Sequence, residues 1–266
     1  MDAVGIIAGG GRLPFVAAAE ARAQGRRVVA VGLRGETDPA LAEVVDALHW
    51  VRLGQLGAVV KSFRREGVRE ALLLGKVDIT HLFSRIRPDL LGARVLFKAR
   101  DLRGDSVLEA IVETLRGEGI TILETPPFLT PLMLQAGLLT RRAPSGQEQR
   151  DITLGREVGR QIAGLRIGQT VVLKNGTVVA VESVEGTDAA IRRGGQLARG
   201  GVVVVKVARA DQDLRFDLPT IGSETLAALR DAAATALALD AGRTLVLDRE
   251  RFVRGADALN LAVVAG

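Results

Sequence analysis

Short apolar runs alternate with amphipathic stretches along the first half of the chain. The runs are too short for helices and are typical of strands. We predict five such strands, at residues 4–8, 28–33, 48–53, 71–74 and 120–123. The stretches between them have the spacing of helices, and regular strand–helix alternation predicts a parallel sheet with helices on both faces. The first half is therefore expected to form a Rossmann-like α/β domain.

Turn residues indicate where individual helices begin and end. Pro14 lies in the first turn of the first predicted helix, where the missing N–H has no cost, and Gly25 stands where that helix should end. Another helix is predicted to begin at Ser106, because Ser106 and Glu109 have the spacing of a capping box. Gly117 is expected to end this second helix.

The second half shows a different order of elements. A helix over about 151–165 is followed by a hairpin, because Asn175-Gly176 between two apolar runs is a strong signal for a type I′ turn. The later elements are predicted to be a helix at 188–197, a strand at 202–207, a helix at 223–239, and strands near Leu245 and Leu261. This half is therefore expected to be a mixed α/β domain.

The stretch between the halves breaks both patterns, because it is rich in proline and ends in the polar run 145–149. We therefore predict an N-terminal domain at 1–125, a linker at 126–150 and a C-terminal domain at 151–266. The apolar residues 128–139 of the linker are expected either to pack in an ordinary way or to help accommodate an acyl chain.

Composition narrows the chemistry that the chain can perform. The 266 residues include no cysteine, no tyrosine and two histidines, so thiolate chemistry is excluded and acid–base steps fall mainly on Asp, Glu and Lys. His49 is expected to pack on a strand and His81 to begin a helix, and neither is expected to bind a metal. The formal net charge of +5 comes mostly from arginine, which suits phosphate or carboxylate ligands.

Charge and hydropathy also restrict the partners. Aromatic residues make up 3% of the chain and do not interleave with the basic clusters, so nucleic acid is not expected to bind. No secretion signal precedes the first strand, and no uncharged apolar run approaches the ~20 residues that span a bilayer. We expect a cytoplasmic protein whose contact with a membrane, if there is any, is peripheral. A homodimer is compatible with the sequence.

Residues 7–14 combine the end of a strand, a glycine turn and the start of a helix. Backbone amides at such a helix N-terminus can receive phosphate, which makes Gly9, Gly10 and Gly11 candidate ligand-binding residues. The turn departs from the dinucleotide pattern, because Pro14 stands where a third Gly or Ala is needed, and it lacks the Gly-Lys-Ser/Thr ending of the Walker pattern. A phosphate contact and a merely tight turn both remain open.

Two further turns carry polar residues at the start of a helix. Thr187 and Asp188 follow a predicted strand, and they either cap the next helix or contact a phosphate or sugar. Two arginines follow one turn later. Arg103 ends a basic stretch, and the neighbouring Asp105 is either a helix cap or a ligand of a metal or substrate.

The segment 211–222 has the most unusual sequence in the chain. If it is extended, Asp213, Arg215 and Asp217 share one face, because side chains alternate with period two. A carboxylate that is kept ionised by an arginine can bind a divalent cation or orient water. A structural salt bridge is the alternative.

Five motifs follow one another along the chain: the glycine turn 9–11, Arg103-Gly104-Asp105, 167–172, 185–188 and 216–222. Together they resemble the LpxI family of lipid A biosynthesis over nearly the whole chain, and the last two are far more specific than the glycine turn. The resemblance implies hydrolysis of UDP-2,3-diacylglucosamine to UMP and 2,3-diacylglucosamine 1-phosphate, with Mg²⁺, on the cytoplasmic side of the inner membrane. Water is implied to attack the phosphorus nearer the sugar. Because the glycine turn lies in one half and the Asp217 segment in the other, we expect the substrate to be held between the two domains.

The same resemblance implies roles for individual residues. Asp217 matches the essential aspartate of the family and is the expected catalytic residue. The expected substrate-binding residues are Gly9, Gly10, Gly11, Arg103, Thr187, Asp188 and Thr220. The expected metal ligands are Asp217, Asp188 and Asp105. The Gly-Asp-Asp motif of the family stands here as Gly104-Asp105-Ser106, so its second acid is missing.

Two other classes of function remain open. A Rossmann-type oxidoreductase is suggested by the glycine turn, although Pro14 and the want of a clear ribose-binding acid after the second strand weigh against it. A nucleotide-sugar or lipid-binding module without catalysis would keep the ligand site but would not need Asp217. A calcineurin-like phosphoesterase is excluded, because neither histidine stands in the Asp-x-His or Gly-Asn-His signature of that class.

Overall fold

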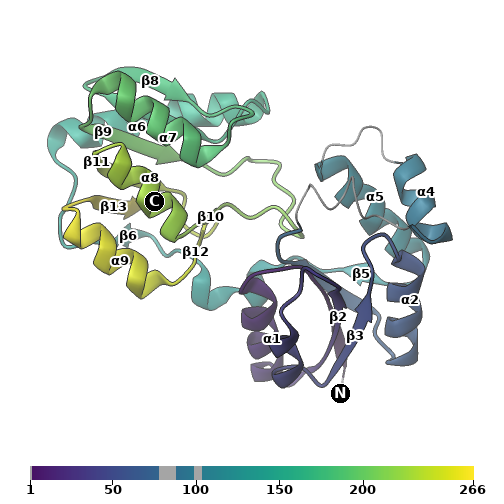
Figure 1. The fold of residues 1–266 in the computed structure, drawn as a ribbon. Coiled ribbons are helices and arrows are strands. Elements are labelled where there is room, and N and C mark those ends of the chain that lie inside the picture. Colours follow the sequence, from purple (N-terminus) through teal and green to yellow (C-terminus); the bar gives the residue numbers. More distant parts are fainter. Residues whose placement is uncertain (1, 78–87, 99–103) are drawn as a thin grey trace. The chain divides into compact units, whose positions relative to one another are not determined.

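The computed structural model describes residues 2–77, 88–98 and 104–266, without the side chains of Gly104 and Asp105. The chain divides into two compact units. The N-terminal unit contains Met1–Pro131 together with Leu214–Phe216, and the C-terminal unit contains Leu132–Asp213 and Asp217–Gly266 (Figure 1). The division after Pro131 falls inside the predicted linker.

The N-terminal unit is built on a parallel five-stranded sheet in the order β3-β2-β1-β4-β5. Its strands are β1 (Ala3–Ala8), β2 (Arg27–Leu33), β3 (Ala47–Val51), β4 (Glu70–Leu74) and β5 (Thr121–Ile122). All five predicted strands are therefore present, and the Rossmann-like fold class is confirmed. Strands β2 and β3 follow β1 on one side of the sheet, and β4 and β5 follow on the other side, so the strand order reverses between β1 and β4. Sheets of this type usually bind ligands at this topological switch point.

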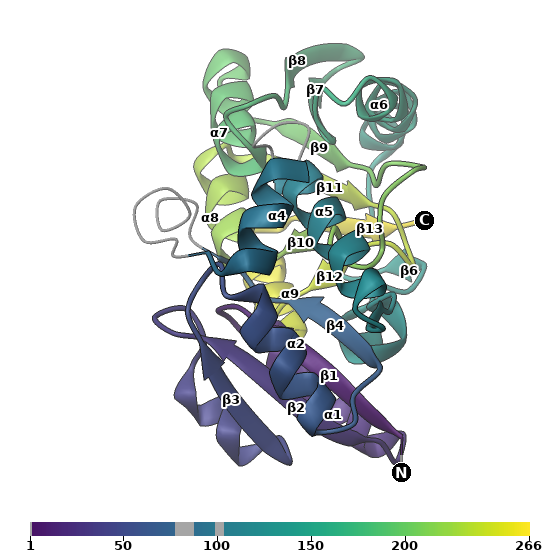
Figure 2. The ribbon, with the colours of Figure 1, turned by 90° about the vertical axis from the view of Figure 1, so that its right-hand side faces the viewer.

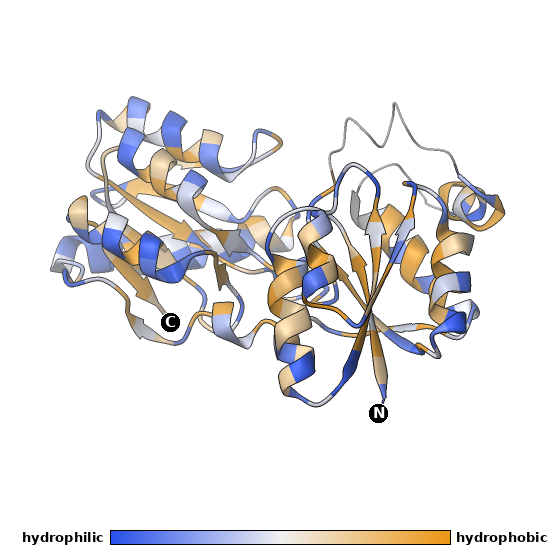
Figure 3. Cartoon of the chain, turned by 60° about the horizontal axis from the view of Figure 1, so that its bottom comes forward, coloured by the Kyte–Doolittle hydropathy of each residue, from blue (hydrophilic) through white to orange (hydrophobic). Residues whose placement is uncertain are grey.

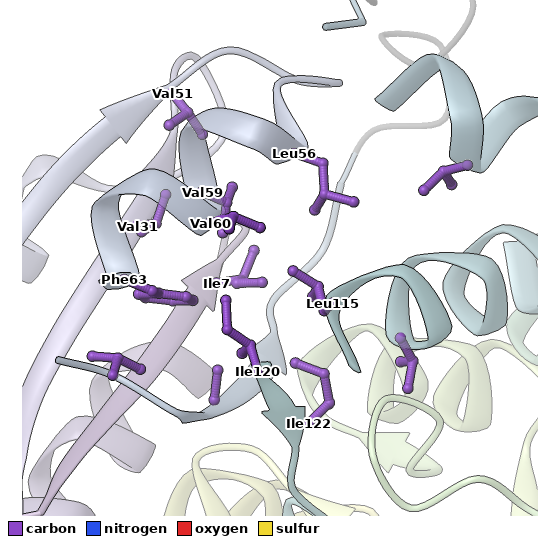
Figure 4. Packing of buried hydrophobic residues seen from close by; sticks show 14 of the residues in the cluster. Ile7, Val31, Val51, Leu56, Val59, Val60, Phe63, Leu115, Ile120 and Ile122 are labelled. Carbon is purple, nitrogen blue, oxygen red and sulfur yellow. The ribbon is translucent and has the colours of Figure 1, made fainter. Parts of the chain in front are cut away.

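Helices cover both faces of this sheet (Figure 1). They are α1 (Leu13–Ala23), α2 (Leu56–Arg65), α4 (Leu90–Lys98) and α5 (Gly104–Gly117), with short 3₁₀ turns at Pro39–Glu43, Pro126–Phe128 and Thr130–Leu132. Helix α2 places Val59, Val60 and Phe63 against Ile7 and Val31 of the sheet in one continuous core (Figure 4). As predicted, Pro14 lies in the first turn of α1, whereas α5 begins two residues before Ser106.

The C-terminal unit is built on a mixed six-stranded sheet in the order β6-β13-β11-β9-β7-β8. Its strands are β6 (Gly137–Leu138), β7 (Thr170–Lys174), β8 (Thr177–Val181), β9 (Val202–Lys206), β11 (Ala234–Leu239) and β13 (Ala262–Ala265). A separate parallel pair joins β10 (Thr220–Ile221) to β12 (Leu245–Val246). The predicted mixed α/β domain is confirmed.

Four helices enclose this sheet, namely α6 (Gly146–Gly164), α7 (Thr187–Ala198), α8 (Ser223–Asp231) and α9 (Arg249–Ala258). Strand β9 shows how they are divided between the faces. Val203 and Val205 pack with residues of α6, whereas Val202 and Val204 pack with residues of α7, α8 and α9. Figure 2 shows α6 and α7 on opposite sides of β7. Apolar residues accordingly concentrate on the strands and on the inner sides of the helices (Figure 3).

The predicted hairpin turn is confirmed, and a buried carboxylate supports it. Asn175 and Gly176 both have positive φ, 50° and 78°, as a type I′ turn requires. The carboxylate of the buried Asp151 accepts hydrogen bonds from both of their amides, at 2.9 and 2.7 Å. The sequence pattern of the hairpin alone does not reveal this support, because Asp151 lies on α6, 24 residues before Asn175 in the chain.

The helix predicted over 223–239 is wrong in its second half. Helix α8 ends at Asp231, Ala233 has a φ of 45°, and Ala234–Leu239 forms strand β11 between β9 and β13. Its alanine-rich sequence favours a helix locally. Burial on both faces of the sheet overrides that preference, because Ala236 and Ala238 pack towards α6 while Leu237 and Leu239 pack on the opposite face.

Helix α6 begins five residues before the predicted start at Asp151. Ser145 is its N-cap and forms a capping box with Glu148, so the polar run 145–149 is the start of a helix. Arg142 donates two hydrogen bonds to the Glu148 carboxylate, both at 2.8 Å. These bonds hold the pKa of Glu148 at about 2, against burial, which acts in the opposite direction.

Replacement of Glu148 by Gln is expected to destabilise the protein by up to about 3 kcal/mol at neutral pH. The folded protein binds a proton at Glu148 less readily than the unfolded chain, whose ordinary value is 4.5. The contribution is therefore complete above pH 4.5 and is lost as the pH falls towards 2. Denaturant unfolding at several pH values checks this, with Glu157→Gln on the exposed side of α6 as the control. A difference from wild type that is equal at pH 7 and pH 3 would contradict the assignment.

Candidate active site

A lysine ammonium marks the candidate site in the C-terminal unit. Lys206 is the last residue of β9, and strand alternation places it on the same face as Val202 and Val204, towards α7. Its Nζ donates a hydrogen bond to the Oγ1 of Thr187, the first residue of α7, at 2.9 Å. Thr187 Oγ1 in turn donates to Glu182 Oε1 at 2.8 Å. The site thus joins the carboxyl end of a strand to the start of a helix.

Burial lowers the pKa of the Lys206 ammonium, because removal from water disfavours the charged form. Three negative charges oppose this effect, and they belong to Glu182, Asp188 and Asp217. The structure therefore brings the predicted residues Thr187, Asp188 and Asp217 to one region, around a lysine that sequence analysis did not select.

Asp217 is held by Arg209, a residue that sequence analysis did not select. Arg209 Nη2 donates to Asp217 Oδ2 at 2.7 Å, and about a third of the Asp217 side chain is exposed to solvent (33%). The Asp217 amide donates to the Asp213 carbonyl at 2.9 Å, so the chain turns here. The segment is therefore not extended here, and the condition under which Asp213, Arg215 and Asp217 would share one face is not met. Within this turn, Leu214–Phe216 belongs to the N-terminal unit.

Two glutamines support the backbone of Arg209. Gln212 Oε1 accepts hydrogen bonds from the Arg209 amide at 2.9 Å and from Gln169 Nε2 at 3.2 Å. Gln212 is 8% exposed. Gln169 lies in the motif 167–172, for which sequence analysis suggested no role, and here it helps to fix the loop that carries Arg209.

Other predicted residues of this unit have local roles. Thr187 does not cap α7, whose N-cap is Gly186 without a side-chain bond. Arg192 and Arg193 form ion pairs with Asp231 and Glu185, at 3.1 and 2.5 Å.

The hydroxyl of Thr220, also predicted to bind substrate, donates to the Leu218 carbonyl at 3.0 Å.

In the N-terminal unit, His49 forms a hydrogen bond with Glu66 at 2.9 Å. Hydrogen bonds from Arg27, which has the larger effect, and from His49 lower the pKa of the Glu66 carboxyl.

The glycine turn of the N-terminal unit is tied to the neighbouring strand. The amides of Gly9 and Gly10 donate to the carbonyls of Leu74 and Lys76, at 2.8 and 2.7 Å. A Cβ on Gly9 would lie 2.5 Å from the Lys76 oxygen, so a side chain does not fit there. Gly11 has a φ of 89° and open space around its Cα. Two of the three glycine amides are thus used within the fold, and the phosphate contact stays a prediction.

An apolar pocket of about 360 Å³ opens at the carboxyl ends of β1 to β4 in this unit. Gly9 and Gly75 lie in its wall, and most of the wall is aliphatic. Helices α4 and α5 contribute Val95, Leu108 and Ile111, and Phe216 adds an aromatic ring. The pocket thus occupies the switch point of the sheet, where Rossmann domains bind polar dinucleotides, with a lining that suits hydrocarbon.

Arg103 and His81 lie outside the described residues, and Asp105 lies in α5 without a described side chain. Among the residues that the structure does describe, no group of three or more acidic or histidine side chains is placed to hold a metal ion by itself. Nor does any helix within 2–77, 88–98 and 104–266 have the length and apolar character needed to cross a membrane.

Solved structures give only distant likenesses. Biotin carboxylase from Campylobacter jejuni matches with a TM-score of 0.30 and 10% identity, over 74% of this chain and 42% of that one. N5-carboxyaminoimidazole ribonucleotide synthetase from Thermotoga maritima matches with a TM-score of 0.26 and 14% identity, over 70% and 42%. This chain spans about two fifths of the length of those proteins. Likenesses this weak indicate neither a shared fold nor a shared function.

Sequence comparisons are decisive for the family. The model of the LpxI N-terminal domain matches residues 3–132, and the model of the LpxI C-terminal domain matches residues 135–264. A protein from Caulobacter vibrioides, named UDP-2,3-diacylglucosamine pyrophosphatase LpxI, is 34% identical over 275 residues, which cover 99% of this chain and 97% of that protein. The chain therefore belongs to the LpxI family.

Proposed function

We propose that this protein hydrolyses the pyrophosphate bond of UDP-2,3-diacylglucosamine and releases UMP and 2,3-diacylglucosamine 1-phosphate. The name of its relative from Caulobacter vibrioides supports the substrate. The observation that carries the proposal is the apolar pocket of the N-terminal unit, because a diacylated sugar needs such a pocket and a dinucleotide does not. The same pocket disfavours a Rossmann-type oxidoreductase.

An acyl chain gains about 0.8 kcal/mol for each methylene group that it buries. The aliphatic wall built by β1 to β4, α4 and α5 can therefore anchor the lipid part of the substrate without any polar contact. A substrate with two acyl chains is expected to come from a lipid surface, so we include peripheral contact with the cytoplasmic side of the inner membrane in the proposal.

The pyrophosphate of the substrate needs positive charges and hydrogen-bond donors. In the C-terminal unit, Lys206, Arg209 and the start of α7 provide them. We propose Asp217 as the catalytic residue, with Thr187, Asp188 and Thr220 as substrate contacts in the same unit. Gly9, Gly10, Gly11 and Arg103 are proposed to contribute contacts from the N-terminal unit. One substrate would then use groups from both units, and a variant in either unit should lower the same turnover.

A divalent cation fits the donor set of the C-terminal unit. Mg²⁺ is usually bound by one or two carboxylates together with the phosphates of a substrate, so it does not need a complete protein cage. Asp217 and Asp188 are the proposed ligands, and Asp105 is the third predicted one. When bound, Mg²⁺ would neutralise charge on the pyrophosphate.

Removal of divalent cations is expected to stop turnover, and addition of Mg²⁺ is expected to restore it. The test measures release of UMP from UDP-2,3-diacylglucosamine by the purified protein, before and after treatment with EDTA. The melting temperature of the treated protein is the control for unfolding. Full activity in excess EDTA would contradict the role of the cation, and absence of UMP under all conditions would contradict the proposed function.

A further inference from the structure

Two lysines of the C-terminal sheet lie at the ends of neighbouring strands and have different surroundings. Lys174 ends β7, and its Nζ donates to the carbonyls of Ala198 and Gly200 at 2.8 and 2.7 Å. Ala198 is the last residue of α7 and Gly200 lies two residues beyond it, so Lys174 has an evident structural role as a cap of that helix end. Lys206 ends β9 and makes no comparable contact with backbone carbonyls in the described part of the chain.

The Lys206 ammonium carries three N–H donors. Among the described residues, its hydrogen-bond acceptor is a single hydroxyl oxygen, that of Thr187. Two of the three carboxylates nearby are engaged elsewhere, and of these Glu182 accepts from Thr187 at 2.8 Å and from the Gln169 amide at 3.2 Å. Asp217 accepts from Arg209 at 2.7 Å. The ammonium is therefore held in a mostly buried position with donors to spare.

Thr187 fixes where that ammonium lies. Its hydroxyl hydrogen goes to Glu182, which leaves a lone pair directed to Lys206 Nζ. Burial of a lysine is costly, and the pKa of Lys206 is lowered accordingly. A helix cap such as that of Lys174 offsets this cost with two carbonyls. Lys206 has one hydroxyl acceptor among the described residues, and the charges of Glu182, Asp188 and Asp217 offset its burial only in part. A costly buried charge near carboxylates is typical of functional sites.

We propose that Lys206 is a catalytic residue whose ammonium contacts the phosphoryl oxygens of the substrate, and that Thr187 and Glu182 position it. This inference rests on the proposed hydrolysis of a sugar pyrophosphate. In that reaction the water oxygen bonds to the phosphorus nearer the sugar, and the bond from this phosphorus to the bridging oxygen breaks. The electron pair stays on the bridging oxygen, which leaves with UMP, and a proton of the water goes to solvent.

The role of Lys206 in this step is electrostatic. Negative charge grows on the bridging oxygen as UMP departs, and a fixed ammonium that is itself largely removed from water stabilises that charge without rearranging. No proton transfer from Lys206 is needed. Its loss should therefore lower kcat more than it raises KM, because the contact strengthens as the charge develops.

The test compares Lys206→Met with wild type and with Lys174→Met, in steady-state hydrolysis of UDP-2,3-diacylglucosamine and in thermal melting. We expect Lys206→Met to lose at least about 30-fold in kcat while it remains folded. Lys174→Met is expected to melt at a lower temperature and to keep its turnover when it is folded. Turnover by Lys206→Met within threefold of wild type would overturn the inference.

A second variant covers the case in which Lys206→Met does not fold. Thr187→Val keeps the shape of the side chain and leaves the ammonium in place, but it removes the acceptor that orients Nζ. We expect at least about a tenfold loss in kcat, and unchanged kcat would overturn the inference. If wild type itself releases no UMP, the proposed function fails, whereas an active wild type with an equally active lysine or threonine variant refutes the role of Lys206 alone.

Discussion

Asp217→Asn is expected to lower kcat by two orders of magnitude or more, equivalent to about 3 kcal/mol, while the protein keeps its fold. The carboxylate is partly exposed and is held by Arg209 at 2.7 Å, so it is fixed and yet accessible to a ligand. A carboxylate that binds a cation or orients the attacking water matters most where charge develops. Its loss should therefore affect kcat more than ground-state binding.

The matched control is Asp211→Asn, in the same loop. Asp211 forms an exposed ion pair with Arg166 at 2.8 Å and a longer one with Arg209 at 3.9 Å, and surface pairs of this kind contribute little. The control therefore also reports how far a slight disturbance of Arg209 affects turnover. Melting temperature, substrate affinity and turnover are measured on the same preparation of each variant. Near-normal turnover of Asp217→Asn together with a lower melting temperature would make Asp217 a structural partner of Arg209 and move the search to Asp188 and Asp105.

Leu108→Trp is expected to reduce kcat/KM for the acylated substrate by about 50-fold. Leu108 lies on α5 in the wall of the apolar pocket and is only partly buried. The larger indole ring of tryptophan should therefore extend into the pocket without overpacking the core. Exclusion of about three methylene groups would cost about 2.4 kcal/mol of binding. Hydrolysis of a sugar pyrophosphate that lacks acyl chains should be unchanged.

Glu109→Trp serves as the control for the bulky ring, because Glu109 is exposed on the same helix and does not line the pocket. Both variants are assayed against the acylated and the chain-free substrate. An equal loss for the two substrates would indicate a general disturbance of α5. No loss for either substrate would contradict the assignment of the pocket to the acyl chains.

Local patterns predicted the N-terminal unit well and parts of the C-terminal unit less well. Strands such as β1 and β2 are apolar runs bounded by turn residues, so their pattern depends little on distant parts of the chain. Strand β11 was predicted as a helix, because alanine favours a helix unless a sheet buries it on both faces. The start of α6 was missed although its capping box, Ser145 with Glu148, is visible in the sequence.

The candidate site was predicted through its motifs and not through its contacts. Thr187, Asp188 and Asp217 are in motifs that resemble the family, whereas Lys206 and Arg209 lie outside them. Lys206 meets Thr187 only because β9 ends beside the start of α7, and a sheet order of this kind cannot be inferred from local spacing. The lysine that closes the run Val202–Val205 is not a sufficient signal, because Lys174 closes the buried strand β7 in the same way and caps a helix end.

The most direct test of the account is hydrolysis of UDP-2,3-diacylglucosamine in water enriched in oxygen-18, followed by mass spectrometry of the products. We expect UMP without the label and 2,3-diacylglucosamine 1-phosphate with one labelled oxygen, because water attacks the phosphorus nearer the sugar. Label in UMP would contradict the proposed point of attack. Recovery of intact substrate with active, folded protein and Mg²⁺ present would contradict the proposed function itself.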